Sequence, residues 1–221
     1  MKKLYRLLPL AVALALAGMA LGDGGGEKTD AQPSASQAEL RAVALQPLGF
    51  LGQELRFSFQ VESQPTDWNP YLTRFGTEDY RAVIAWGDEQ SLWEQADYEN
   101  PAATLFARRG GSVEPILLRA QRYDRFEAKG ILRQVLGGRP WIELTDLQLL
   151  EEHFSEGSMV HAARGVELMA DEHWELAAQS FERALASNLA ARARDELARL
   201  QAECLGHVPA PIEPPAKKKH R

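Results

Sequence analysis

The hydrophobic and polar positions alternate with period two through much of the first half of the chain. The clearest case is residues 55–61, where LRFSFQV places apolar and polar side chains strictly in turn. Such alternation is typical of a β-strand with one face buried and the other in water. Four more segments rich in strand-forming residues follow, at 80–86, 104–107, 123–136 and 141–150. We therefore expect five strands before residue 151.

The last two of these segments form the centre of the predicted fold. Phe126, Ala128 and Leu132 fall on one face of the first segment, and Gly130 marks the point where the opposite, polar face becomes apolar. A glycine at such a switch indicates a β-bulge that redirects the strand. The pair at 137–138, Gly-Gly, supplies the positive φ angles of a tight hairpin turn. A long bulged strand and its hairpin partner are expected to close a small barrel.

Shorter features are expected between the strands. Residues 40–45 are weakly apolar, which is consistent with the start of another strand. Ser91 and Glu94 have the spacing of a capping box, which predicts a short helix that reaches Tyr98.

The segment 64–78 is predicted to be a loop, and it carries Trp68, Tyr71 and Phe75. Aromatic residues on a loop can form a stacking platform for a ligand. They can also fold back as a lid on an apolar end of the barrel. We favour the lid, because a loop of this length needs packing of its own.

After Glu151 the hydrophobic period changes from that of a strand to that of a helix, and three amphipathic helices are expected. Their apolar faces comprise Met159, Ala162, Val166 and Met169; Trp174, Ala177, Ala178, Phe181 and Leu185; and Leu189, Ala193, Leu197, Leu200 and Cys204. The predicted fold class is therefore α+β, with a five-stranded barrel followed by a helical region.

The N-terminal residues 1–22 have the features of a secretory signal peptide. Basic residues are followed by an apolar run of 15 residues at 7–21, and small residues favour cleavage after Ala20 or Gly22. The apolar run is shorter than the roughly 20 residues that a membrane-spanning helix needs. We expect a periplasmic or secreted protein without a stable membrane segment after cleavage. Anchoring by an uncleaved N-terminal helix is the alternative.

The chain is thus divided into five parts. They are a signal peptide at 1–22, a flexible linker at 23–39, a barrel domain at 40–150, a helical region at 151–206 and a tail at 207–221. The linker is rich in Gly, Pro, Ser and Gln and cannot form a core. The tail is proline-rich and then basic, which predicts a disordered, solvated end, with attraction to an anionic surface as the alternative.

The net charge limits the class of partner. The 25 Lys and Arg against 31 Asp and Glu give −6, and cleavage after Gly22 would remove three basic residues and no acidic ones, which leaves −9. Nucleic acid is an unfavourable partner for such a chain, because phosphate contacts supply most of that affinity. The single cysteine, Cys204, cannot form an internal disulfide and lies on an apolar helix face, so we expect it to be buried rather than to link two chains.

The motifs of common enzyme classes are absent from the sequence. None of the five His forms the i, i+4 pair of a helical zinc site. There is no Gly-x-Ser-x-Gly and no glycine-rich loop of a nucleotide site. We therefore expect a protein that is not an enzyme and needs no metal or cofactor.

One region departs from the acidic average. Residues 105–140 contain eight basic and three acidic residues. Arg125, Lys129 and Arg133 recur on the polar side of the central strand, where they could line an anion-binding face together with the aromatic loop. A solvated face that Glu127 partly neutralises is the alternative, and we favour it.

The strand segments resemble the OB-fold, a small Greek-key barrel. The stretches that carry the resemblance are FLGQELRFSFQV at 50–61, YRAVIAWG at 80–87 and YDRFEAKGILRQVLGGRPWIEL at 123–144. An SH3-like barrel is the competing architecture. The resemblance implies binding of oligonucleotides, oligosaccharides or proteins, and the fold alone does not choose among them.

The stretch AARGVELMADEHWELAAQSFERALASN resembles one tetratricopeptide (TPR) repeat, with 189–205 as a capping helix. Counted from Gly165, the apolar and small residues of the repeat fall on Leu168, Ala177, Phe181 and Ala184. The usual Trp and Leu of the first helix are replaced by His161 and Arg164, and no Pro ends the repeat. The resemblance implies protein interaction through His161, Arg164, Gly165, Leu168 and Trp174.

These features predict a non-enzymatic binding or scaffold protein of the bacterial envelope, whose helices and barrel recruit another envelope protein. One repeat cannot bury its apolar face alone, so it is expected to dock on the barrel, to form a homodimer or to pack on a partner. The alternative is a barrel that binds an anionic oligosaccharide or single-stranded nucleic acid through Trp68, Tyr71 and Phe75 and the basic residues of the central strand.

Overall fold

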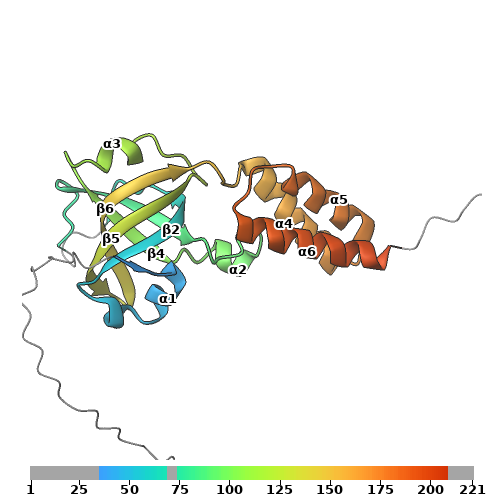
Figure 1. Ribbon diagram of the computed structural model, residues 1–221, viewed down its shortest axis with the longest axis horizontal. Helices are drawn as coiled ribbons and strands as arrows, with labels where there is room; N and C mark the ends of the chain where they lie inside the picture. The colour runs from blue at the N-terminus through green and yellow to red at the C-terminus, as the bar shows by residue number, and fades with distance from the viewer. Residues whose placement is uncertain (1–34, 69–73, 209–221) are drawn as a thin grey trace, which may run out of the picture. The chain divides into compact units, whose positions relative to one another are not determined.

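Five strands of the chain close into a barrel (Figure 1). They are β2 (Glu54–Ser63), β3 (Tyr80–Gly87), β4 (Ala103–Arg108), β5 (Arg125–Leu136) and β6 (Arg139–Leu150). The computed structural model describes residues 35–68 and 74–208, which belong to one unit that begins at Ala35. The predicted signal peptide, Tyr71 and residues 209–221 of the predicted tail lie outside the described residues.

The connectivity of the barrel is that of a Greek key. Strands β2, β3 and β4 are successive antiparallel neighbours, and β5 returns to pair with β2. Strand β6 then pairs antiparallel with β5 and parallel with β4, which completes the closure. All five predicted strands are present.

The β5–β6 hairpin has the predicted bulge and turn. Gly137 and Gly138 have φ angles of 57° and 78°, so the turn needs glycine at both positions. The pairing of the two strands shifts register between Lys129 and Gly130. A Cβ atom on Gly130 would lie 2.7 Å from Cγ2 of Ile142, so β6 can approach closely only because residue 130 has no side chain.

The segment at 40–45 forms a helix, α1 (Leu40–Leu45), so the expected start of a strand is wrong. Leu40 and Val43 are fully buried in the barrel core, and their spacing of three places both on one helical face. Just before α1, the short strand β1 (Ser36–Gln37) pairs parallel with β2. Ser36 and Gln37, which fall within the predicted linker at 23–39, therefore belong to this strand.

Three short helical segments fill other connections. They are the 3₁₀ helix η1 (Pro47–Phe50), α2 (Gln95–Tyr98) and α3 (Glu114–Leu117). The predicted capping box at 91–94 does not form, because the Ser91 N–H donates to Oδ2 of Asp97 at 2.8 Å and the Glu94 side chain caps nothing. The helix therefore starts later than the sequence pattern indicates.

Three longer helices follow the barrel. Helices α4 (Glu156–Ala170) and α6 (Ala191–His207) both pack on α5 (Trp174–Leu185) (Figure 1). Ser155 is the N-cap of α4 and forms a reciprocal capping box with Ser158, which satisfies two backbone donors at the start of the helix. None of the helices in the described part of the chain is both long and apolar enough to cross a membrane.

Helices α4 and α5 approach closely at Gly165. A Cβ atom there would lie 2.5 Å from Cε1 of Phe181, whose ring is fully buried. Ala177 and Ala184 on α5 are also fully buried, so small residues line the contact. Cys204 of α6 is buried, as expected.

We expect Gly130→Ala to lower the free energy of unfolding by about 1–3 kcal/mol, the usual cost of overpacking. The new methyl group would meet both Ile142 and the carbonyl oxygen of Glu143, which lies 2.9 Å from the ideal Cβ position. Urea denaturation provides the measurement. Gly49→Ala is the matched control, since no atom lies within 4 Å of its Cβ position. Equal stability of the two variants would contradict the close approach of β6.

Gly165→Ala should also destabilise the protein, because the overpacking cost of about 1–3 kcal/mol exceeds the gain in helix propensity of about 1 kcal/mol. The control is Gly206→Ala on α6, where the Cβ position is open and the same propensity gain should appear as added stability. The two variants should therefore shift the thermal midpoint in opposite directions. A shift in the same direction would show that the α4–α5 contact tolerates a methyl group.

Candidate functional site

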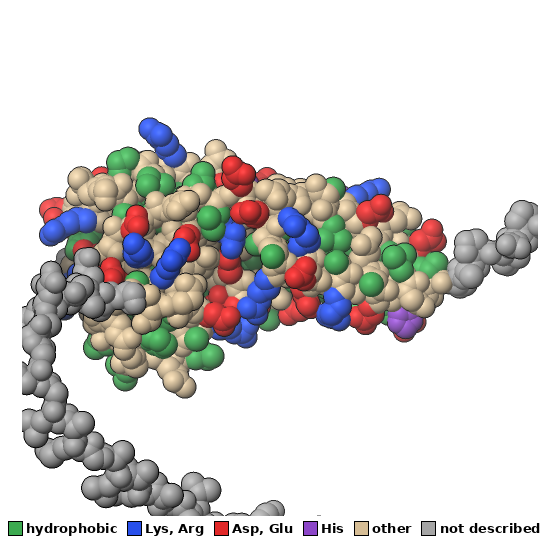
Figure 2. Space-filling view, in the orientation of Figure 1, with side chains coloured by type: hydrophobic (Ala, Val, Ile, Leu, Met, Phe, Trp, Pro, Cys, Tyr) green, Lys and Arg blue, Asp and Glu red, His purple; other side chains and the backbone are tan. Residues whose placement is uncertain are grey.

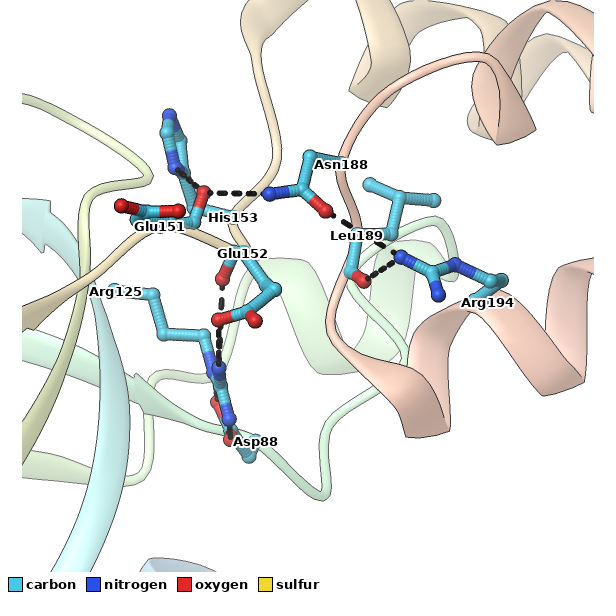
Figure 3. A network of polar contacts seen from close by, with 8 residues as sticks. All are labelled: Asp88, Arg125, Glu151, Glu152, His153, Asn188, Leu189 and Arg194. Atoms are coloured by element: carbon cyan, nitrogen blue, oxygen red, sulfur yellow. Dashed lines mark hydrogen bonds and ion pairs between the residues drawn. The ribbon is translucent and has the colours of Figure 1, made fainter.

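Arg125, Lys129 and Arg133 lie on the outer face of β5, as predicted, but each has a carboxylate partner. Nε of Arg133 donates to Glu143 at 2.7 Å, and Nζ of Lys129 lies 3.5 Å from Asp146 on the paired strand. Arg125 is also paired, within the network drawn in Figure 3. The positive charges of the predicted anion-binding face are thus neutralised by the protein itself.

Neighbouring charges on this surface are paired in the same way. Arg56 on β2 donates two hydrogen bonds of 2.9 Å to Glu127 on β5, and this interaction lowers the pKa of Glu127 below its usual range. Figure 2 shows basic and acidic side chains interspersed over the drawn face of the barrel. Cross-strand ion pairs therefore account for this surface better than an anion site does.

Trp68 and Phe75 of the loop 64–78 cover the outer face of the barrel and not its end. Phe75 is fully buried and stacks on Phe106 of β4, with ring centroids 4.2 Å apart. Trp68 meets Phe106 edge-on at 5.5 Å, and its Nε1 donates to the carbonyl oxygen of Phe75 at 2.6 Å. Trp141 of β6 stacks on Phe106 from 4.9 Å.

The alternation of β3 and β4 places this cluster outside. Val83 and Leu105 belong to the barrel core, whereas Ala82 and Phe106, one residue away on each strand, point to the opposite face and join Phe75. The lid hypothesis named the wrong surface. The ligand-platform hypothesis fails for Phe75, which has no exposed ring face to offer.

Arg125 joins the barrel to the chain that leads into the helices (Figure 3). Its Nε donates to the two carboxylate oxygens of Asp88 at 2.9 and 2.8 Å. Another nitrogen donates to the backbone carbonyl of Glu152 at 3.4 Å and lies 3.8 Å from the carboxylate of that residue. The side chain is only 15% exposed, so it has a structural role that the sequence pattern did not indicate.

A second set of hydrogen bonds holds the α5–α6 connection beside the same segment (Figure 3). The Asn188 side chain donates to the carbonyl of Glu151 at 3.4 Å, and the His153 N–H donates to the carbonyl of Asn188 at 2.9 Å. Arg194 donates to the carbonyl of Leu189 at 2.8 Å. The chain between β6 and α4 is therefore fixed to both the barrel and the helices.

The five residues that the TPR resemblance implies for protein interaction do not form one open surface. Gly165 is buried in the α4–α5 contact, and Leu168 and Trp174 pack partly into the helical core. His161 is half-buried and Arg164 is exposed. Three of the five therefore serve packing within the described helices.

A cleft of about 750 Å³ lies between residues 88–93 and α6, and six of its thirteen lining residues are charged. Several of these charges are already neutralised. Arg199 donates to Glu196 at 2.7 Å, and Arg192 lies 3.3 Å from Glu39. This cleft offers few free groups for recognition.

A groove of about 650 Å³ has a different character. It lies between the insertion 92–98 and one face of α4, and we call it the α4 groove. Its lining is Leu92, Trp93, Glu94, Gln95, Ala96, Tyr98, Tyr123, Met159, Val160, Ala163, Val166, Glu167 and Ala170. Val160 is 64% exposed in it, which is unusual for a large aliphatic side chain beside other apolar residues.

Buried polar contacts shape the wall of the α4 groove that the insertion provides. Gln90 accepts from the Gly87 N–H at 3.0 Å and donates to the carbonyls of Asp97 and Asn100 at 3.1 and 2.9 Å. Nε1 of Trp86 donates to the carbonyl of Tyr98 at 2.9 Å. The insertion is therefore a preformed element rather than a loose loop.

Tyr123 lies at the base of the α4 groove in an uncommon backbone conformation. Its φ is 71°, a region that costs a non-glycine residue free energy. Its hydroxyl lies 3.1 Å from that of Tyr98, and burial is the main cause that raises the pKa of Tyr123 above its usual value. The Arg122 guanidinium lies 5.4 Å from the centre of the Tyr123 ring and adds a cation–π contact.

The sequence contains a helical pattern of apolar residues at this groove that the three predicted apolar faces did not include. Val160, Ala163 and Ala170 recur at helical spacing beside the face that packs on α5. A helix that is apolar on two faces needs a second contact surface. The wall at 92–98 could not be anticipated, because it depends on how the barrel places its insertion.

In 35–68 and 74–208, no group of three or more His, Cys, Asp and Glu side chains is placed to hold a metal ion. Burial raises the pKa of the Cys204 thiol, which disfavours the reactive thiolate.

No protein-family model, curated protein or solved structure matches the chain. The geometry of the barrel, the helices and the α4 groove is therefore the basis for assigning a function.

Glu89 provides a pH-dependent test of the contact between α1 and the segment that follows β3. Its side chain is 8% exposed and accepts a hydrogen bond from the Arg41 N–H, and burial raises its pKa above the ordinary value of 4.5. The folded protein thus binds this proton more tightly than the unfolded chain does. The stabilising contribution is complete below pH 4.5 and is lost as the pH rises through the raised pKa.

Glu89→Gln keeps an acceptor for Arg41 and removes the titration. The variant should therefore gain stability relative to the wild type as the pH rises from 4.5 to 8, measured by urea unfolding across that range. Glu175→Gln, at an exposed position of α5, is the control and should follow the wild type. Parallel curves for wild type and Glu89→Gln would contradict the effect of burial.

Proposed function

We propose that this chain is an exported, non-enzymatic binding or scaffold protein of the bacterial envelope, and that it captures a partner protein in the α4 groove. The observation that carries the proposal is the open apolar groove itself, with Val160 exposed between preformed walls. The other candidate surfaces are occupied, because the cations of β5 are paired and Trp68 and Phe75 are packed on the barrel.

The barrel is, on this proposal, an OB-like domain that serves as a rigid support. Five strands, Greek-key connectivity and closure of β5 on β2 all agree with that fold. OB-folds use the face of their second and third strands for oligonucleotides and oligosaccharides. Here those strands are β3 and β4, and Trp68 and Phe75 of the chain itself cover their outer face. This occupancy argues against the oligosaccharide or nucleic-acid alternative.

The helices α4 and α5 are, on the same proposal, one TPR-like repeat with α6 as its cap. The close approach of Gly165 and Phe181 supports it, as do the fully buried Ala177 and Ala184 at the small positions. The replacements at His161 and Arg164 change the surface on which such a repeat would hold a peptide. We therefore assign recognition to the neighbouring face of α4, which carries Val160.

The α4 groove fits an amphipathic or apolar segment of a partner. Helix-in-groove and extended-peptide recognition both use a preformed apolar groove of this kind. Aromatic residues at its base, Trp93 and Tyr98 among them, are the side chains most often found at the energetic centre of an interface. The signal-like features of residues 1–22 support the proposed export to the envelope.

The test compares two substitutions in affinity capture from a bacterial envelope extract. Val160→Glu places a charge in the groove, whereas Leu176→Glu changes an apolar residue of α5 that is 51% exposed and lies outside it. Partner proteins identified by mass spectrometry should be retained by the wild type and by Leu176→Glu. With a purified partner, Val160→Glu should weaken binding at least about tenfold, because an unpaired charge opposes burial.

Equal capture by Val160→Glu and the wild type would move the contact away from the groove. Loss with both substitutions would point to a general effect of added charge. A melting temperature that rises on adding an anionic glycan or an oligonucleotide, with no protein captured, would support the ligand-binding alternative instead.

A further inference from the structure

The α4 groove carries two carboxylates without a counter-charge. Glu94 and Glu167 both line it and both are exposed. Neither side chain has an ion-pair partner within residues 35–68 and 74–208, although many other acidic side chains of the barrel are paired. No Lys or Arg lines the groove. Its occupant should therefore be apolar in one part and basic in another.

The chain contains a segment of this composition after its last described residue. Residues 209–221 have the sequence PAPIEPPAKKKHR. Four prolines and one isoleucine lie within 209–215, and a basic cluster ends the segment. Proline-rich segments bind aromatic-lined grooves because little conformational entropy remains for them to lose. The base of the α4 groove contains Trp93, Tyr98 and Tyr123.

The position of Val208 places the start of this segment near one end of the groove. The ring of His207 stacks on Trp174 at 4.1 Å. Ala170 lines the groove, and Trp174 comes four residues after it. The two residues are therefore at most about 15 Å apart. The thirteen residues after Val208 can span up to roughly 43 Å when extended. The distance along α4 from Ala170 to Val160 is about 15 Å.

We propose that residues 209–221 dock in the α4 groove of the same chain, with the prolines against the aromatic base and Lys217, Lys218 and Lys219 beside Glu94 and Glu167. The segment then covers Val160 and competes with a partner protein. The competition rests on the function proposed above, whereas the docking itself does not. Binding of partner requires release of the segment, so the groove is self-inhibited at rest.

The test uses the full chain at low concentration and a zero-length carbodiimide cross-linker, which joins a lysine amine to a carboxylate in direct contact. Peptide mapping by mass spectrometry should find intramolecular links from Lys217–Lys219 to Glu94 and Glu167. Val160→Arg should lower the yield of these links at least about tenfold, since its charge opposes burial of the prolines and repels the lysines. Leu176→Arg, outside the groove, should leave the yield unchanged.

A second variant guards against loss of the links through misfolding. Glu94→Gln with Glu167→Gln removes only two exposed carboxylates, so the melting temperature should stay within a degree or two of the wild type. The links from Lys217–Lys219 should then be lost and should not reappear elsewhere on α4. Tail links distributed over exposed carboxylates of the whole chain would overturn the docking. Links between two chains that increase with concentration would also overturn it and would make a second copy the occupant.

The two proposals fail in different ways. Intramolecular links without any captured partner would retain the docking and remove the proposed function. Capture that depends on Val160, in a chain whose tail forms no links to Glu94 or Glu167, would retain the function and remove the docking. If both hold, a chain that ends at Val208 should bind the purified partner more tightly than the full chain does.

Discussion

The double pairing of β5 is the constraint on which the barrel depends. The same residues, Arg125 to Ile131, bond to β2 along one edge and to β6 along the other, so β5 closes the sheet on itself. Closure requires β6 to shift register at Gly130, where only a residue without a side chain lets Ile142 come close. Closure removes the exposed edges that an open sheet would leave for aggregation. Arg125, the first residue of β5, then connects the barrel to the segment that leads into the helices.

The elements that local chemistry determines were predictable from the sequence. Strict alternation at 55–61, the bulge at Gly130, the Gly137–Gly138 turn and the helical periods after Glu151 all depend on residues close in the chain. Leu40–Leu45 was not predictable as a helix from six weakly apolar residues, because burial of Leu40 and Val43 on one face is decided by the barrel.

The contacts of the candidate site were harder to predict, for a physical reason. Arg125 and Asp88 are 37 positions apart, and Trp68 reaches Phe106 from the loop 64–78, so neither contact leaves a local pattern. A basic stripe and an aromatic loop are the same sequence features whether they face a ligand or the protein itself. The structure separates the two cases by showing what each side chain contacts. The α4 groove is composite in the same sense, since Val160 and Trp93 come to line one groove only after folding.

This composite origin has an energetic consequence. One wall of the groove belongs to an insertion of the barrel and the other to α4, and the Arg125 network fixes the chain between them. Any segment that contacts both walls binds only when the two are correctly placed, so its binding energy adds to the stability of that placement by linkage. A preformed polar network lowers the ordering cost that binding would otherwise incur. On the proposed function, the barrel contributes to recognition through rigidity, because Phe75 and Trp68 cover the outer face of β3 and β4.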